Sequence, residues 1–111
     1  MQRILTTTDQ SQVEPPRVLT LAAATATVIF PMAAGLRGPE IVSRYVQNLT
    51  GADLYLSFGI GTDNAPVCNN TNNFHAVITD KQLYDCMGHR RIVCAYSVGG
   101  GVVATTQLTR V

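Results

Sequence analysis

The sequence predicts an all-β fold: a single β-sandwich, jelly-roll-like or small barrel domain with an extended N-terminal arm. From Arg44 to the C-terminus, short β-type segments alternate with glycine and asparagine turns. Residues Leu54, Leu56 and Phe58 alternate with polar neighbours, the period of a half-buried strand. Seven or eight segments at this spacing are typical of two packed sheets or a small barrel. At 111 residues the chain is long enough for one domain with its own core.

Residues 1–16 form the predicted arm, and residues 17–111 form the predicted sandwich domain. The arm is rich in Gln, Thr and Ser and ends in Pro15 and Pro16, which forbid a helix there and impose an extended path. With no apolar period of its own, the arm cannot form a core. We therefore expect it to lie on its own domain or on a neighbouring subunit.

Two strands are predicted at the start of the domain, over residues 17–21 and 25–30. Pro31 ends the second one, because proline cannot donate to a strand ladder. The alanine run 22–24 between them could instead form a helical turn. Residues 35–39 contain two glycines and a proline and are predicted to be a turn.

Residues 41–49 could form a strand or a short helix. We favour a strand, because Thr-Gly-Ala-Asp at 50–53 suits a hairpin that leads into the strand at 54–58. The stretch 59–73 has no period of either kind and is predicted to be a long surface loop.

Alternation resumes at 74–78, followed by a turn at Asp80 and Lys81 and a short strand at 83–86. Residues 87–89 are predicted to form another turn. The following strand, 91–97, is apolar on both faces, which indicates a central position in a sheet.

The last strand is predicted over residues 102–109, after the glycines 99–101. Three consecutive glycines can supply the positive φ angles of a tight hairpin loop. We therefore expect this strand to pair with the one before it.

The three cysteines, Cys68, Cys86 and Cys94, cannot all pair within one chain. An odd count fits a reducing compartment in which thiols act as small buried apolar groups. Cys86 and His89 have the spacing of half a zinc site, with Cys68, Cys94 and His75 as possible completing ligands. Zinc sites usually show two close pairs, however, and only one is present. We expect no metal.

A cysteine nucleophile would need a histidine base and an orienting polar group. His75 or His89 could serve Cys68 or Cys86, with Asp85 as the orienting group. No local sequence resembles a known nucleophile turn. His75, on a strand, is more often a satisfied structural histidine. We predict no catalytic residue and no cofactor.

The loop 59–73 is a possible binding site for calcium or a sugar, through Asp63, Asn64 and the asparagines 69–73. Calcium loops place several carboxylates at alternate positions, and this stretch has one. We favour a solvated loop whose asparagines satisfy their own turns, and no small-molecule substrate.

The charge and hydropathy of the sequence argue against nucleic-acid binding and against insertion into a membrane. The net charge is +1 and the basic residues are scattered, so a nucleic-acid partner is not expected. The apolar stretch 18–36 contains many threonines, Pro31 and Gly35, which do not suit a signal peptide or a membrane span.

Protein partners are the remaining expectation, because seven of the eight cations are arginine, which suits protein contact surfaces better than lysine does. The candidate interface residues are the arm and domain positions Arg3, Ile4, Leu5, Val13, Arg17, Arg37, Arg90 and Arg91.

Residues 40–111 also resemble a known group of proteins in the style and order of their segments. The segments that carry the likeness are, in chain order, Tyr-Val-Gln-Asn-Leu-Thr-Gly, the asparagine-rich loop, Asn-Phe-His-Ala-Val-Ile, Leu-Tyr-Asp-Cys, Arg-Arg-Ile-Val-Cys-Ala-Tyr-Ser-Val, the triple glycine and Val-Val-Ala-Thr-Thr-Gln-Leu-Thr-Arg. The order resembles small virion proteins of tailed bacteriophages, and among them the capsid decoration (cement) proteins.

This resemblance implies a homotrimer on the outside of the phage head, assembled in the bacterial cytoplasm. There it would clamp neighbouring subunits of the major capsid protein, and it would have no catalytic residues. An arm of this length spans roughly 50 Å at about 3.3 Å per residue, enough to touch the next subunit. The alternatives are a carbohydrate- or receptor-binding module of a phage fibre, or another head protein such as a penton or connector.

Overall fold

The computed structural model describes residues 11–31, 40–86 and 91–110, and these residues form strands and turns with no helix. The prediction of an all-β chain is confirmed. The strands are β1 (Ser11–Val13), β2 (Arg17–Leu21), β3 (Thr27–Phe30), β4 (Glu40–Leu49), β5 (Leu54–Phe58), β6 (Gly61–Thr62), β7 (Ala65–Pro66), β8 (Ala76–Ile78), β9 (Leu83–Asp85), β10 (Val93–Tyr96) and β11 (Gly101–Arg110).

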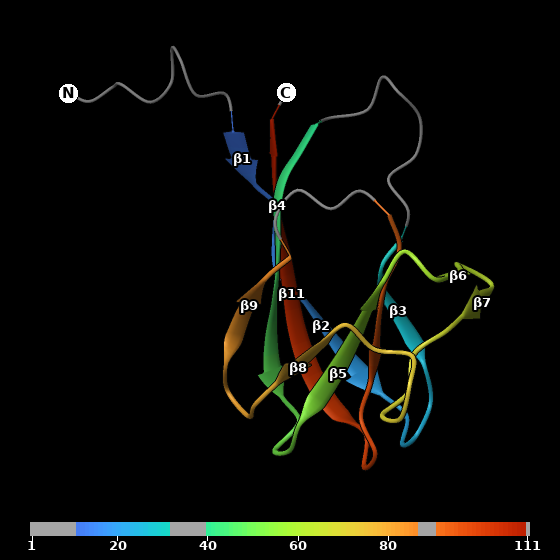
Figure 1. Cartoon of the computed structure of the whole chain (residues 1–111). Helices are drawn as coiled ribbons and strands as arrows, with labels where there is room; N and C mark the ends of the chain where they lie inside the picture. Colours follow the sequence, from blue (N-terminus) through green and yellow to red (C-terminus); the bar gives the residue numbers. More distant parts are fainter. Residues whose placement is uncertain (1–10, 32–39, 87–90, 111) are drawn as a thin grey trace.

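The strands form two antiparallel sheets and one small hairpin (Figure 1). Sheet A has the order β1-β11-β4-β9, and β2 pairs with the same edge of β11 as β1, further along it. Sheet B has the order β3-β10-β5-β8. Strands β6 and β7 pair only with each other.

Of the connections that the structure describes throughout, four lead from one sheet to the other: β2 to β3, β4 to β5, β8 to β9 and β10 to β11. The predicted hairpins at 50–53 and 99–101 are therefore wrong, because each joins strands of different sheets. Turn residues reverse the chain locally but do not choose its partner. β4 pairs with β11 over most of its length, a longer ladder than a hairpin with β5 could offer.

The main core lies where side chains of both sheets meet. Along β4 and β11 the buried members alternate with half-buried residues, as the period of two requires. They are Leu21, Ile29, Phe30, Val46, Leu54, Leu56, Ile78, Cys86, Val93, Ala95 and Val103. Burial of one large apolar side chain of this kind contributes about 1.5–3 kcal/mol, so the cluster stabilises the packing of the two sheets.

A second cluster lies on the other face of sheet B, around Cys68, Ile92 and Cys94. The loop 59–73 covers it: Ser57 Oγ donates to the carbonyl of Val67 at 2.6 Å. The prediction of a plain surface loop is corrected, because this loop contains β6 and β7 and buries Cys68. The prediction that β10 is a central strand is confirmed, since β3 and β5 pair with its two edges.

Most other predicted strands and turns are found. β2, β4, β5, β9 and β11 occupy the predicted ranges within one or two residues. Residues 22–24 form a turn, with Ala24 at a φ of 50°, and not a helix. The predicted turns at 35–39 and 87–89 lie outside the described residues.

No helix in the described part of the chain could span a membrane, and the apolar stretch that begins at Val18 forms β2 and β3.

Candidate partner-binding end

Several segments that carry predicted interface residues join the body at one end of the molecule. In sheet A, Arg110 pairs with Ser11 on one side and with Glu40 on the other, so β1, the start of β4 and the end of β11 lie together (Figure 1). In sheet B, the last residue of β3, Phe30, pairs with the first residue of β10, Val93. Contacts of Arg44 connect these two places.

Arg44 is the residue that joins the sheets at this end. It lies on β4 at an inward position and is 2% exposed. Its Nη2 donates to the carbonyl of Pro31 at 3.0 Å, and its Nη1 donates to the carbonyl of Arg91 at 3.0 Å. Its Nε donates to Oε1 of Gln107 at 2.9 Å. The guanidinium carbon lies 5.0 Å from the ring centroid of Phe30, a cation–π distance.

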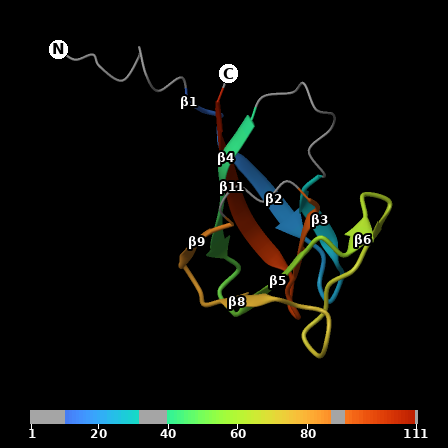
Figure 2. The same ribbon diagram turned by 45° about the horizontal axis from the view of Figure 1, so that its top comes forward.

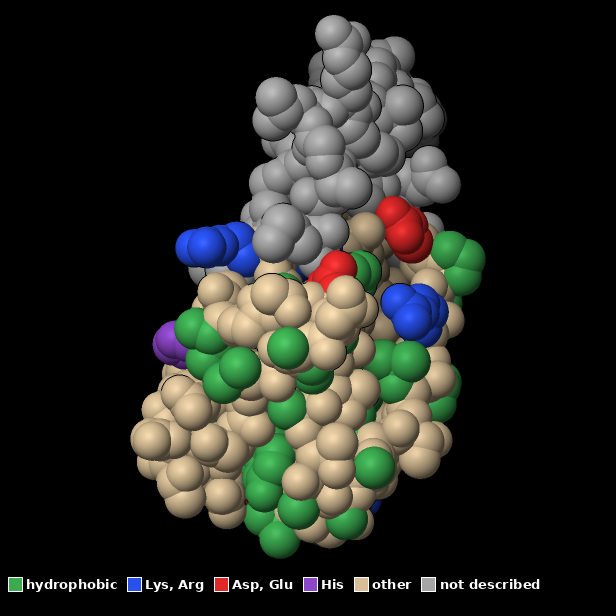
Figure 3. All heavy atoms as spheres, turned by 90° about the vertical axis from the view of Figure 1, so that its right-hand side faces the viewer, with side chains coloured by type: hydrophobic (Ala, Val, Ile, Leu, Met, Phe, Trp, Pro, Cys, Tyr) green, Lys and Arg blue, Asp and Glu red, His purple; other side chains and the backbone are tan. Residues whose placement is uncertain are grey.

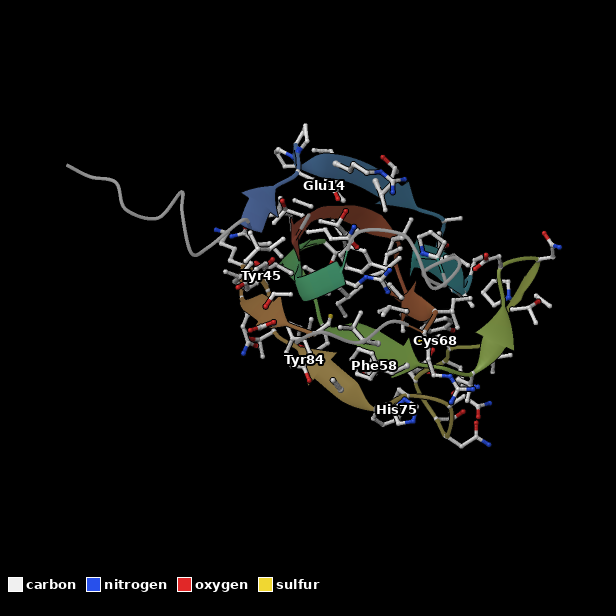
Figure 4. The ribbon with its side chains drawn as sticks, turned by 90° about the horizontal axis from the view of Figure 1, so that it is seen from above. Glu14, Tyr45, Phe58, Cys68, His75 and Tyr84 are labelled. Carbon is white, nitrogen blue, oxygen red and sulfur yellow. The ribbon has the colours of Figure 1, made fainter. Side chains whose placement is uncertain are left out.

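The base of the arm is tied to the same network through Glu14. The backbone N–H of Glu14 donates to the carbonyl of Gln107 at 2.9 Å, and Gln107 Nε2 donates to Glu14 Oε2 at 3.2 Å. Thr106 Oγ1 donates to the carbonyl of Glu14 at 3.0 Å. Gln107 thus connects a carboxylate at the base of the arm with the buried guanidinium of Arg44, and the labelled Glu14 is visible in Figure 4.

The described part of the arm lies on its own domain, one of the two expected places. Residues 11–13 pair with β11, and Pro15 and Pro16 carry the chain from β1 to β2. Strand pairing of residues 11–13 and the backbone hydrogen bond of Glu14 hold this part of the arm on β11.

Of the predicted interface residues, Arg17 and Arg91 are described as exposed, on β2 and just before β10. Val13 belongs to β1. The others lie outside the described residues: Arg3, Ile4, Leu5, Arg37 and Arg90. The roles of Arg44, Gln107 and Glu14 were not predicted from the sequence. The sequence did contain one indication: Arg44 is two residues before Val46 and therefore lies on the same, inward face of the strand.

Charged side chains are unevenly placed on the face in Figure 3. There most of the visible Lys, Arg, Asp and Glu side chains lie in the upper part of the coloured surface, and hydrophobic side chains are scattered over the rest of it. The upper part is the end at which β1 and the last residues of β11 lie (Figure 1). On this face, the visible charged side chains therefore lie mainly toward the end at which β1 joins sheet A.

An aromatic row closes one side of the two sheets. Phe58 on β5 stacks on Tyr84 of β9, with ring centroids 6.2 Å apart, and His75 lies 5.7 Å from Phe58 on the other side (Figure 4). His75 Nδ1 accepts the backbone N–H of Phe58 at 3.0 Å. The prediction of a structurally satisfied histidine is confirmed for His75.

The three cysteines are free and buried. Burial raises the pKa of Cys68 to about 11, and burial together with the nearby Asp85 raises the pKa of Cys86 to about 12. Burial also raises the pKa of Cys94. The thiols are therefore protonated at neutral pH, the opposite of an activated nucleophile.

Metal ligands do not cluster in the described part of the chain, where no three His, Cys, Asp or Glu side chains come together. His89, the partner of Cys86 in the candidate zinc pair, lies outside it. Cys68 Sγ donates to the carbonyl of Tyr55 at 3.4 Å, so this thiol already has a hydrogen-bond partner.

The asparagines of the loop 59–73 bond to one another, as predicted. Asn69 Oδ1 accepts the backbone N–H groups of Thr71, Asn72 and Asn73 at 2.9–3.0 Å. The amide of Asn69 donates to Asn72 Oδ1 at 3.2 Å. These oxygens hold the turn, and their lone pairs are taken up by the chain itself.

Comparison of the chain with protein-family models, curated proteins and solved structures found no match. The function therefore has to be inferred from the arrangement of the residues.

Proposed function

We propose that this protein is a structural virion protein that decorates a phage capsid and clamps neighbouring subunits of the major capsid protein. The observation that carries the proposal is the strand order. Eight strands form the rows β2-β11-β4-β9 and β3-β10-β5-β8, with chain crossings between the rows. This order supports a jelly roll, a double-sheet sandwich made of two Greek keys that recurs in viral capsid domains.

A jelly roll also occurs in lectins, so the fold alone does not select the function. The loop 59–73 argues against the sugar-binding alternative, because the oxygens of Asn69 and Asn72 are engaged inside the loop. The protonated, buried thiols argue against a thiol enzyme. A binding role that needs no chemistry agrees best with these features.

The end that carries the arm suits the clamp role. Three hydrogen bonds of Glu14 and the pairing of β1 fix the base of the arm on β11. From that fixed point, residues 1–10 reach about 33 Å when extended, far enough to contact a neighbouring subunit. Ordering such a segment on a partner costs entropy, which many copies on one shell offset by avidity.

Cosedimentation with empty shells tests the proposal. The shells would be assembled from the major capsid protein encoded in the same genome. Deletion of residues 1–10 leaves β1 and Glu14 in place, so the body is expected to keep its urea midpoint and to lose binding to shells. Unchanged occupancy of the shells by this variant would refute the role of the arm.

Charge reversal provides a second, independent test of the proposal. The double variant R17E/R91E changes two exposed arginines at the arm end and is expected to weaken shell binding. The matched control is K81E, because Lys81 is also exposed but lies in the turn between β8 and β9, at the opposite end. Equal effects of the two changes would contradict a localised binding end.

A further inference from the structure

Two of the three free cysteines lie together on the outer face of sheet B. Cys68 and Cys94 are 5% and 0% exposed and belong to the same buried cluster, where the loop 59–73 meets the sheet. Cys68 comes from the loop, and Cys94 comes from the central strand β10. The proposed function makes no use of this pair, although two neighbouring thiols can be joined by oxidation.

Strand register and hydrogen bonds place the two thiols around Ser57. Cys94 lies directly opposite Ser57, because β10 and β5 pair at these positions. The Ser57 hydroxyl lies within hydrogen-bond reach of both thiols, and it donates to the carbonyl of Val67 at 2.6 Å. Cys94 is also hydrogen-bonded to the backbone of Val67, the residue before Cys68. The loop therefore brings Cys68 to the part of β10 where Cys94 lies.

Cys86 lies in a different part of the molecule. It is buried in the main core between the two sheets, together with Val93 and Ala95 of β10. Cys94 belongs to the cluster on the opposite, outer face of sheet B. Sheet B itself separates Cys86 from the other two thiols, so the fold favours one of the three possible pairings.

We propose that Cys68 and Cys94 form a disulfide when the protein meets an oxidising small-molecule disulfide, and that this bond links the loop 59–73 covalently to β10. A disulfide brings its sulfur atoms to about 2.0 Å. The Cys68 thiol would therefore leave the carbonyl of Tyr55, to which it donates at 3.4 Å in the reduced protein. The inference goes beyond the proposed function and does not rest on it.

The reaction consists of two thiol–disulfide exchanges, with oxidised glutathione as the oxidant. One cysteine, as its thiolate, attacks a glutathione sulfur, the glutathione S–S bond breaks, and the glutathione thiolate that leaves takes up a proton. The second cysteine attacks the mixed disulfide, which forms the bond between the two cysteines and releases the second glutathione in the same way. Two electrons pass from the cysteine sulfurs to glutathione, and the two thiol protons end on its two reduced molecules.

Burial controls the rate of this reaction. Both thiols are buried and protonated at neutral pH, so oxidised glutathione reacts with them only when the loop opens or before the chain has folded. In a reducing compartment both cysteines remain thiols, and an oxidising environment converts them.

Refolding in a glutathione redox buffer tests the proposal, because access to the thiols then does not limit the reaction. The full chain would be reduced and unfolded in urea, freed of reductant, and diluted into buffers with increasing ratios of oxidised to reduced glutathione. Alkylation and peptide mass spectrometry then locate the bond. We expect a Cys68–Cys94 disulfide, an alkylated Cys86, and a urea midpoint raised by about 1–2 M.

The unfolded chain provides the matched control. Oxidation in urea should favour the pair that is closest in sequence, because closing a short loop costs less entropy. Cys86 and Cys94 are 8 positions apart, whereas Cys68 and Cys94 are 26 positions apart. Loop length alone therefore favours the short pair by about sixfold. A preference for the long pair after refolding is a property of the tertiary structure.

Two variants identify the partners. C86A keeps both proposed partners and should form the same disulfide, whereas C68A should leave Cys86 and Cys94 as free thiols. Far-UV circular dichroism shows whether each variant is folded.

Three outcomes would overturn the proposal: three alkylated cysteines at every glutathione ratio, a bond to Cys86 in the refolded protein, or a Cys68–Cys94 bond that lowers the urea midpoint. The first two are measured on the wild-type chain, so they do not depend on the folding of a variant. The experiment uses no capsid, and its result is independent of the shell-binding test.

Discussion

Replacement of Arg44 by alanine is the change that most directly tests how the two sheets are joined. The guanidinium is buried and donates to three acceptors at 2.9–3.0 Å, two of which are backbone carbonyls at strand ends of sheet B. The R44A variant leaves the carbonyls of Pro31 and Arg91 without this donor. It also removes the cation from the ring of Phe30.

The expected loss can be worked out from these contacts. A buried acceptor that loses its partner costs about 1–3 kcal/mol, and the cation–π contact contributes about 1 kcal/mol. Gln107 can turn toward water, and water can enter at the end of the sheets, so each contribution falls at the low end of its range. The free energy of unfolding is therefore expected to fall by about 3 kcal/mol.

Urea denaturation followed by far-UV circular dichroism measures this loss, because the chain contains no tryptophan for fluorescence. With a slope of about 1.5 kcal/mol per molar urea, the midpoint should fall by about 2 M at an unchanged slope. R44K keeps the positive charge but not the planar fork of donors, so we expect an intermediate midpoint.

The matched control is R17A, which removes an exposed arginine from the neighbouring part of sheet A. Surface changes of this kind usually alter stability by less than about 0.5 kcal/mol. If R44A and R17A shift the midpoint equally, the buried arginine does not join the sheets in the way described.

Three further predictions concern the turns and thiols. G100A should destabilise the protein by about 2 kcal/mol in thermal unfolding, because Gly100 has a φ of +74° and an added Cβ would lie 2.7 Å from the carbonyl oxygen of Leu21. Stability should fall as pH rises from about 9 toward 11–12: burial raises the pKa of Cys68 to about 11 and of Cys86 to about 12, so the unfolded chain loses these protons first. N69A should lower the melting temperature by several degrees, about 1–2 kcal/mol, because Asn69 Oδ1 accepts several donors of its turn.

Each of these predictions has a control in the same region. G99A should be tolerated better than G100A, since a Cβ at Gly99 would meet no atom within 4 Å. A C68A/C86A variant should show a flatter loss of stability above pH 9 than the wild-type protein, and an equal slope would contradict the thiol assignment. N70A replaces an exposed asparagine of the same loop, and a loss as large as that of N69A would contradict the turn-holding role.

Local sequence patterns predicted the strands well and their partners poorly. Alternation at Leu54, Leu56 and Phe58 and the doubly apolar segment 91–97 correspond to β5 and to the central strand β10. The turns at 50–53 and 99–101 are also real, but both were predicted to be hairpins. A turn has the same residues whether the chain returns beside itself or crosses to another sheet.

The candidate binding end was predictable in part. Exposed arginines and a polar arm with two prolines indicated a contact with protein, and Arg17 and Arg91 are exposed at that end. The buried role of Arg44 was not predictable, because its acceptors come from distant parts of the chain. Gln107, for example, is separated from Arg44 by 63 positions.

The amino-acid sequence by itself determined that this protein is all-β, where most of its strands begin and end, and that its three thiols cannot all pair within one chain. These properties follow from the period of two, from turn residues and from an odd cysteine count, all of which can be read without knowing which segments meet. The tertiary structure alone decided which strands pair, that the cysteines are free, that Cys68 is buried beneath a polar loop, and that Arg44 lies inside. The reason is physical: pairing and burial depend on contacts between segments far apart in the chain, and β11 alone pairs with β1, β2 and β4.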